Sequence, residues 1–165
     1  MIDYCDQKAE VEKNPQAKQW IKAASNGDVY AYEFLWRLWC FEHCFDDLID
    51  QDVEINKELC VRELIKFVTC LSYNPFYQEH KDQIYGLLVQ ACTRWLDGDE
   101  WEQSEDETRR ICASVVRCGD LDIWLHVAYL TGGWDYMRKL RFLRHYDVNL
   151  PEQELKGIKS KKEAE

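Results

Sequence analysis

The segment Phe41-Glu42-His43-Cys44-Phe45-Asp46-Asp47-Leu48-Ile49-Asp50 decides the fold. Its apolar residues recur every three or four positions, a spacing that is typical of one face of an α-helix. Extended back along the chain, the same face takes in Phe34 and Leu38. The pattern predicts a long helix that is capped by Asp28 and ends near Gln51, and we expect its apolar face to lie in the core.

A second stripe of this helix is both acidic and aromatic. Its members are Trp39, Glu42, His43, Asp46 and Asp50, with Trp36 beside them. Because a face wholly in solvent rarely carries two tryptophans, we expect the stripe to be partly enclosed. Trp36 and Trp39 are therefore candidates to line a pocket.

The composition predicts one compact, mostly helical domain. Among 165 residues, 46% are hydrophobic, and the chain has seven Trp, nine Tyr and six Phe but only three Pro and seven Gly. The net charge of −10 disfavours nonspecific binding to nucleic acid and to anionic membrane surfaces, which both require a positive surface. The N-terminus has neither a basic start nor an apolar run, and no membrane-length apolar run occurs, so we expect a cytoplasmic protein with free thiols.

Breaks in the pattern predict an all-α bundle of about six helices within residues 15–146. A flexible segment, 1–14, precedes it and a charged tail, 147–165, follows it. The expected helices cover about 16–24, 28–51, 53–72, 77–96, 104–131 and 134–145. The fifth is expected to begin at a capping box, Ser104 to Glu107, and can bend at Gly119. Gly132-Gly133 separates it from the sixth.

Three carboxylates of the long helix form the spacing D-D-x-x-D. Asp46, Asp47 and Asp50 lie within one helical turn, where they repel one another. A hard cation such as Mg²⁺ would offset that repulsion, because it prefers oxygen ligands. The alternative is an ordinary solvated face of an amphipathic helix. A zinc site that uses Cys40, His43 and Cys44 is a weaker alternative, since closed zinc sites draw on two such clusters.

A facing helix should complete a magnesium site. Asp122 shares a stripe with apolar residues in the predicted fifth helix, where a carboxylate needs a partner, and His126 follows four residues later. The alternative is a structural Asp–His pair. Three arginines of the sixth helix, Arg138, Arg141 and Arg144, could bind a diphosphate or could pair with acidic surface elsewhere. No catalytic residue can be assigned.

The sequence Asp46-Asp47-Leu48-Ile49-Asp50 on a long helix resembles the aspartate-rich motif of class I terpenoid (isoprenoid) synthases. That resemblance implies Mg²⁺ bound by Asp46, Asp47 and Asp50, and an allylic diphosphate held in an aromatic-lined helical bundle. The family's second metal motif is not present, so the resemblance covers one helix. The chain as a whole also looks like small proteins of tailed bacteriophages, an impression based on segments 34–36, 46–50, 74–77 and 132–134.

Two functions follow as expectations. The first is Mg²⁺-dependent binding or processing of a diphosphate-containing small molecule, by a terpenoid-synthase-like protein or a degenerate relative of one. The second is a non-catalytic phage accessory protein in the bacterial host cytoplasm, which binds a host protein through an acidic, aromatic surface. The acidic stripe can also be completed across a homo-oligomer interface.

Overall fold

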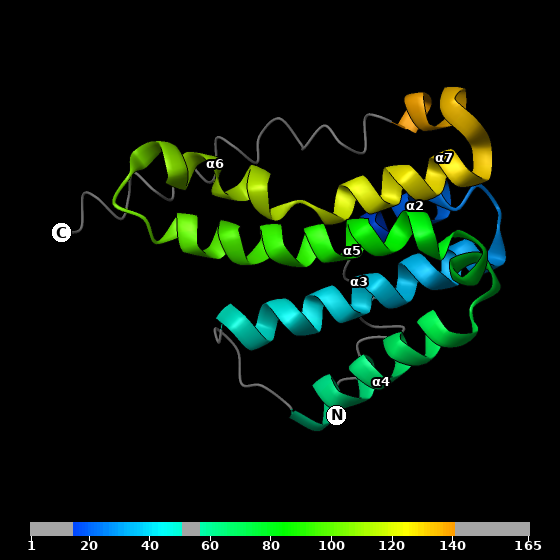
Figure 1. The fold of residues 1–165 in the computed structure, drawn as a ribbon, viewed down its shortest axis with the longest axis horizontal. Helices are drawn as coiled ribbons and strands as arrows, with labels where there is room; N and C mark the ends of the chain where they lie inside the picture. The colour runs from blue at the N-terminus through cyan, green and yellow to red at the C-terminus, as the bar shows by residue number, and fades with distance from the viewer. Residues whose placement is uncertain (1–14, 51–56, 141–165) are drawn as a thin grey trace.

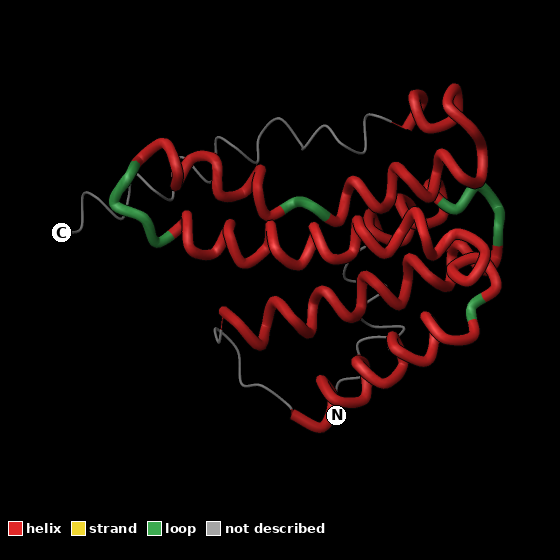
Figure 2. Tube along the Cα trace, viewed as in Figure 1, coloured by secondary structure: helices red, strands yellow, loops and turns green. Residues whose placement is uncertain are grey.

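The computed structural model describes residues 15–50 and 57–140, and the predicted all-α bundle is confirmed. Within those ranges the chain forms only helices (Figures 1 and 2). They are α2 (Pro15–Ala24), α3 (Val29–Asp50), α4 (Lys57–Tyr73), α5 (Pro75–Glu102), α6 (Glu107–Arg117) and α7 (Asp120–Lys139). The expected terminal segments 1–14 and 147–165 lie outside the described residues.

The helices are arranged around α5, the longest of them. Helices α6 and α7 follow one another along one side of α5, while α3 lies along its other side and carries α4 on its outer flank (Figure 1). Helix α2 packs against both α7 and α3. None of these helices is long and apolar enough to cross a bilayer.

The turn between α2 and α3 forms as the sequence predicts. Asn26 and Gly27 adopt positive φ angles of 48° and 84°, which reverse the chain after α2. The Asp28 carboxylate then accepts hydrogen bonds from the backbone N–H groups of Tyr30 (2.8 Å) and Ala31 (2.9 Å). This is the predicted cap of α3, and it supplies acceptors to N–H groups that the helix itself leaves unpaired.

Asn74 fixes the start of α5 against the start of α3. Its side-chain oxygen accepts a hydrogen bond from Tyr77 N–H (3.0 Å), and its amide nitrogen donates to the carbonyl of Tyr30 (2.9 Å). Pro75 follows at the first helical position, where its missing N–H costs nothing. Helix α4 therefore ends where the Asn74-Pro75 pair predicts.

Several predicted boundaries need correction. Helix α5 continues through Gly98 to Glu102. The glycine at this position allows the close approach of α6, since a Cβ at Gly98 would lie 2.9 Å from Cβ of Arg117. The cap of α6 is Asp106, which accepts hydrogen bonds from Thr108 N–H (2.8 Å) and Arg109 N–H (3.4 Å), and not Ser104.

The predicted fifth helix is two helices. The chain leaves helical geometry at Cys118 (φ −79°, ψ 42°) and α7 begins at Asp120. Gly119 lies close to α5, where a Cβ would be only 2.8 Å from Cα of Ala91. The predicted break at Gly132-Gly133 is a kink inside α7, where Gly133 has a φ of 76°.

The core confirms part of the apolar face predicted for α3. Phe34 and Leu38 are buried, whereas Leu48, near the end of the helix, is 47% exposed because no described helix covers it. Cys40 and Cys44, which the helical projection placed opposite the core, are buried. Helix α4 packs against α3, so α3 is covered on its α4 side as well as on its α5 side.

Candidate functional site

A cavity of about 770 Å³ lies between the helices, and the acidic, aromatic stripe of α3 lines it. Trp39, Glu42, His43 and Asp46 all contribute to its wall. The prediction that this stripe is partly enclosed is therefore confirmed for these four residues. The remaining aromatic walls come from the other helices, including Trp20 of α2, Phe67 of α4, Trp95 of α5 and Trp124 of α7.

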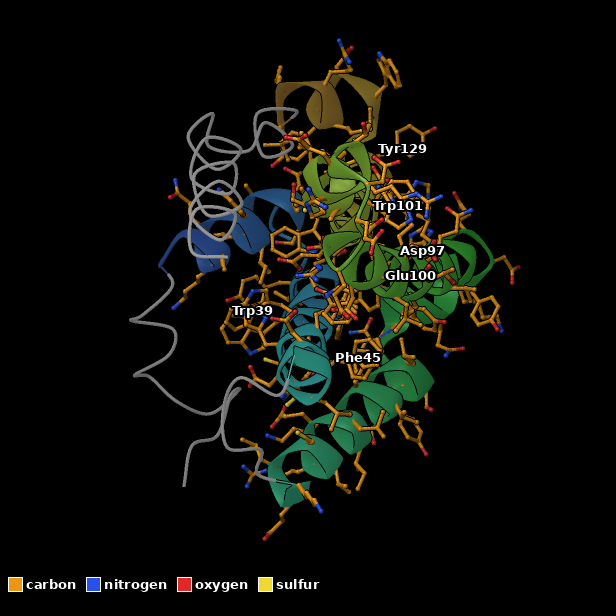
Figure 3. All side chains as sticks on the ribbon, turned by 90° about the vertical axis from the view of Figure 1, so that its left-hand side faces the viewer. Trp39, Phe45, Asp97, Glu100, Trp101 and Tyr129 are labelled. Carbon is orange, nitrogen blue, oxygen red and sulfur yellow. The ribbon has the colours of Figure 1, made fainter. Side chains whose placement is uncertain are left out.

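The regular geometry of α3 aligns the aromatic part of this wall. The Trp39 and His43 rings are 4.1 Å apart, and His43 Nδ1 lies 2.9 Å from the carbonyl oxygen of Trp39. Because a carbonyl can only accept, Nδ1 carries the hydrogen of that bond. Trp36 stacks on Trp39 at 5.2 Å but does not reach the cavity wall itself. Figure 3 shows Trp39 beside α3, on the side toward α2.

Glu42 of α3 and Asp120 of α7 bring two carboxyl groups together at this cavity. Burial raises the pKa of Glu42 well above its ordinary value of 4.5, and the Asp120 charge raises it further. Burial also raises the pKa of Asp120. Hydrogen bonds from backbone N–H groups at the start of α7, and the nearby His43, act in the opposite direction and lower it. Glu42 therefore holds its proton to higher pH than an exposed glutamate.

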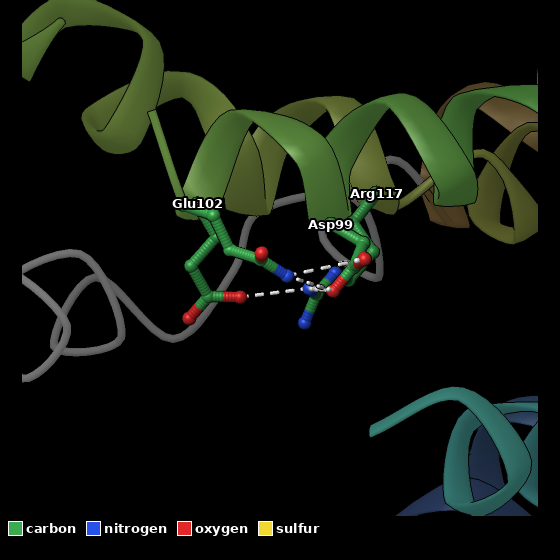
Figure 4. A network of polar contacts seen from close by, with 4 residues as sticks. Asp99, Glu102 and Arg117 are labelled. Carbon is green, nitrogen blue, oxygen red and sulfur yellow. Dashed lines mark hydrogen bonds and ion pairs between the residues drawn. The ribbon is translucent and has the colours of Figure 1, made fainter. Parts of the chain in front are cut away.

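Arg117, at the end of α6, is the one Lys or Arg side chain among the described residues of the cavity wall. Its guanidinium lies 2.7 Å from the Glu102 carboxylate and 3.6 Å from that of Asp99 (Figure 4). It also lies over the Trp95 ring, 5.1 Å from the ring centre. The positive charge of Arg117 is thus met by two acids that are not part of the cavity wall.

Asp46 and Asp47 of the D-D-x-x-D segment do not share one environment. Asp46 lines the cavity, whereas Asp47 acts electrostatically on Cys44, whose nearest ionisable neighbours are Cys60 and Glu63 of α4. The Asp50 side chain lies outside the described residues. Among the side chains that are described, no three His, Cys, Asp or Glu come together in an arrangement that could hold a metal ion.

The partners expected from the facing helix lie away from the cavity wall. Asp122 accepts a hydrogen bond from Arg94 at 2.8 Å, so its carboxylate has a structural partner. His126 lies beside Tyr129, with 6.0 Å between the ring centres. Desolvation lowers the pKa of His126, and the nearby His80 lowers it further.

The apolar stripe that placed Asp122 in the interior is not a core stripe. Ile111 is 43% exposed, Val115 57% and Tyr129 43%. The projection assumed a continuous helix, and the break at Gly119 changes the phase of α7 relative to α6. The cavity acid of α7 is consequently Asp120 and not Asp122.

Of the arginines expected to bind a diphosphate, Arg138 is not in the cavity wall. Arg138 is exposed near the end of α7, where its guanidinium lies 5.8 Å from the centre of the Trp134 ring. That end of α7 lies at the opposite end of the bundle from the C-terminal end of α3 (Figure 1). Arg141 and Arg144 lie outside the described residues.

The cysteines are mixed in state. Cys40 is disulfide-bonded, so it has no thiolate to offer zinc, and the alternative site of Cys40, His43 and Cys44 is not formed. The expectation of free thiols is confirmed for the other cysteines in the described part of the chain, which are Cys44, Cys60, Cys70, Cys92, Cys112 and Cys118.

Sequence reasoning missed two of the residues that other helices bring to α3. Asp120 and Trp95 carry no local motif, and their place at the cavity depends on how α5 and α7 pack. A signal for Asp120 was present, since a carboxylate beside Gly119 stands at the first turn of a helix.

Comparison of the chain with models of protein families, with curated proteins and with solved structures gives no match.

Proposed function

We propose that this protein binds a small, predominantly apolar molecule in the cavity between α3, α5 and α7. The observation that carries the proposal is the cavity itself, with a volume of about 770 Å³ and walls that are largely aromatic and aliphatic. Ligand sites in proteins have volumes of roughly 300–1,000 Å³ and apolar walls with a few polar groups. Glu42, His43 and Asp120 are among the polar groups here.

Access to the cavity supports binding from solvent. Tyr85 and Val89 of α5 belong to the wall and are 65% and 48% exposed. Protein interiors are otherwise packed with few voids larger than a water molecule, so a space of this size between aromatic walls is unlike an ordinary core. A ligand that fills it would remove the apolar walls from water.

Mg²⁺-dependent binding of a diphosphate, by a terpenoid-synthase-like protein, stays a prediction. Asp46 shares the cavity with Glu42 and Asp120, which supports a cation near these acids. The arrangement of the described side chains does not offer three metal ligands, and Arg138 is remote from the cavity. Without a metal, the carboxylates would repel a diphosphate.

Binding of a host protein through the acidic, aromatic stripe also stays a prediction. Trp39 is only 7% exposed, and Trp36 stacks on it, so a partner could not reach both rings without rearranging the core. The enclosed position of the stripe favours a small ligand over a protein partner.

Differential scanning calorimetry with tert-butylbenzene, an uncharged aromatic probe, tests the proposal. Ligand that binds the folded state raises the unfolding midpoint, and we expect a rise that saturates with probe concentration. Leu121→Trp, which adds a larger side chain to the cavity wall, should remove the rise. Tyr129→Trp, on the same helix but outside the wall, should retain it. No rise in the parent protein would contradict the proposal.

A further inference from the structure

Among the described residues, the charged or ionisable groups of the cavity wall include the carboxyl groups of Glu42, Asp46 and Asp120, the imidazole of His43 and the guanidinium of Arg117. Arg117 is already bound to Glu102 and Asp99, so its charge is not available to offset the cavity acids. No ion pair joins a Lys or Arg to Glu42 or Asp120 in the described part of the chain. A carboxylate in an apolar wall is costly unless a positive charge or a proton accompanies it.

The groups that face Glu42 come from several helices. On α3 itself, His43 and Asp46 share its cavity wall. Asp120 faces it from α7, with Asp122 behind, and Cys92 faces it from α5. From α6 the wall receives Arg117 and Cys118, while α2 and α4 contribute only Ala17, Trp20, Phe67 and Leu71. The acids around Glu42 therefore come from α3 and α7, and the basic groups among the described residues are His43 and Arg117.

We propose that the ligand of this cavity is an organic cation, a quaternary ammonium or protonated amine on an apolar body, held between the Glu42 and Asp120 carboxylates and the aromatic rings. The inference rests on the proposed function and names its ligand class. Aromatic faces attract cations, and the attraction is strongest for tryptophan and for desolvated sites. Quaternary ammonium groups suit such a site because they are large and have no N–H groups that need acceptors.

The cavity already contains one contact of this kind. The Arg117 guanidinium lies over Trp95, 5.1 Å from the centre of a ring that lines the cavity. A ligand cation beside Trp39 would make the same kind of cation–ring contact closer to the carboxylates. Trp39 and Glu42 lie three positions apart on α3, so their side chains are neighbours on the helix surface. An anionic ligand would be repelled by the same carboxylates.

Cation binding should be linked to the proton on Glu42. Burial and the Asp120 charge favour the protonated form of Glu42, and a bound cation favours the ionised form. A permanent cation must therefore displace that proton, so its affinity should increase as pH rises toward the raised pKa of Glu42. An uncharged ligand should not share this dependence.

Two probes of one shape separate charge from apolar contact. Phenyltrimethylammonium and tert-butylbenzene differ in a nitrogen that replaces a carbon, so the first carries a permanent charge and the second none. Tryptophan fluorescence of the full chain, titrated with each probe between pH 5 and 8, gives both dissociation constants. The variants are Glu42→Gln with Asp120→Asn, and Asp135→Asn, which removes an exposed carboxylate of the same helix outside the cavity wall.

We expect the cation to bind about tenfold or more tightly than its uncharged analogue. In the Glu42→Gln/Asp120→Asn variant the ratio of the two constants should fall to near one, whereas Asp135→Asn should keep it. Equal or tighter binding of tert-butylbenzene by the parent protein overturns the inference alone. Failure of both probes to bind overturns the proposed function as well.

Discussion

Arg94 of α5 bonds to Asp122 of α7 with 2.8 Å between Nη1 and Oδ2. The same guanidinium donates to the backbone carbonyls of Val116 (3.1 Å) and Val115 (3.2 Å), which end α6. One side chain thus joins α5 to both sides of the break between α6 and α7. This break places Asp120 at the cavity, so the Arg94–Asp122 pair holds the candidate site from behind.

Arg94→Met should lower the free energy of unfolding by about 1–2 kcal/mol. Hydrogen bonds to charged groups contribute roughly 1.5–3 kcal/mol, and partial exposure of both side chains reduces the effect. Urea unfolding followed by circular dichroism measures it. Arg109→Met, at an exposed position of α6, is the control and should change stability by less than about 0.5 kcal/mol. Equal effects of the two changes would contradict a structural role for Arg94.

Gly119→Ala should destabilise the fold, whereas Gly86→Ala should stabilise it. A Cβ at Gly119 would lie 2.8 Å from Cα of Ala91, so α7 and α5 would have to separate, at a cost of about 1–3 kcal/mol. A Cβ at Gly86, inside α5, meets no atom within 4 Å. Alanine there should gain about 0.5–1 kcal/mol from better helix propensity. Thermal unfolding of both variants tests this, and a tolerated Gly119→Ala would mean that the helices are not in contact at this point.

Glu42→Gln should stabilise the protein at neutral pH, and the gain should disappear in acid. The folded state binds the Glu42 proton more tightly than the unfolded chain does, because burial and Asp120 raise its pKa. The stability that this proton contributes is present below pH 4.5 and is lost as pH rises through the raised folded pKa. Glutamine stays neutral throughout and avoids the loss.

Unfolding midpoints measured from pH 4 to 8 check the Glu42 prediction. Glu79→Gln, at an exposed position of α5, serves as the control and should run parallel to the parent protein. A gain for Glu42→Gln that does not depend on pH would show that the ionisation of Glu42 is unaffected by folding.

The sequence predicted those features of the fold that depend on neighbouring residues. Periodicity alone identified α3 and its enclosed stripe of Trp39, Glu42, His43 and Asp46, since side chains three or four apart share a helix face whatever the tertiary structure. The Asp28 cap and the Asn74-Pro75 boundary were predicted for the same reason, because they involve backbone groups within three residues.

Tertiary packing decided what the sequence could not predict. The choice of Asp122 over Asp120 failed because a continuous helix was assumed, whereas the chain leaves helical geometry at Cys118, next to the close approach of Gly119 to Ala91. The extension of α5 through Gly98 likewise reflects contact with Arg117. Likewise, D-D-x-x-D spacing puts three acids within one turn but does not fix their surroundings, so Asp46 and Asp47 meet different neighbours.

The seven tryptophans allow the central claim, a ligand in this cavity, to be tested most directly. Each indole N–H gives its own signal in a proton–nitrogen correlation spectrum, and tert-butylbenzene can be titrated into the labelled protein. The account predicts that the shifted signals belong to the cavity residues Trp20, Trp39, Trp95 and Trp124, while Trp101 and Trp134, which are outside the wall, stay in place. Shifts spread evenly over all the indoles, or no shift at saturating probe, would contradict it.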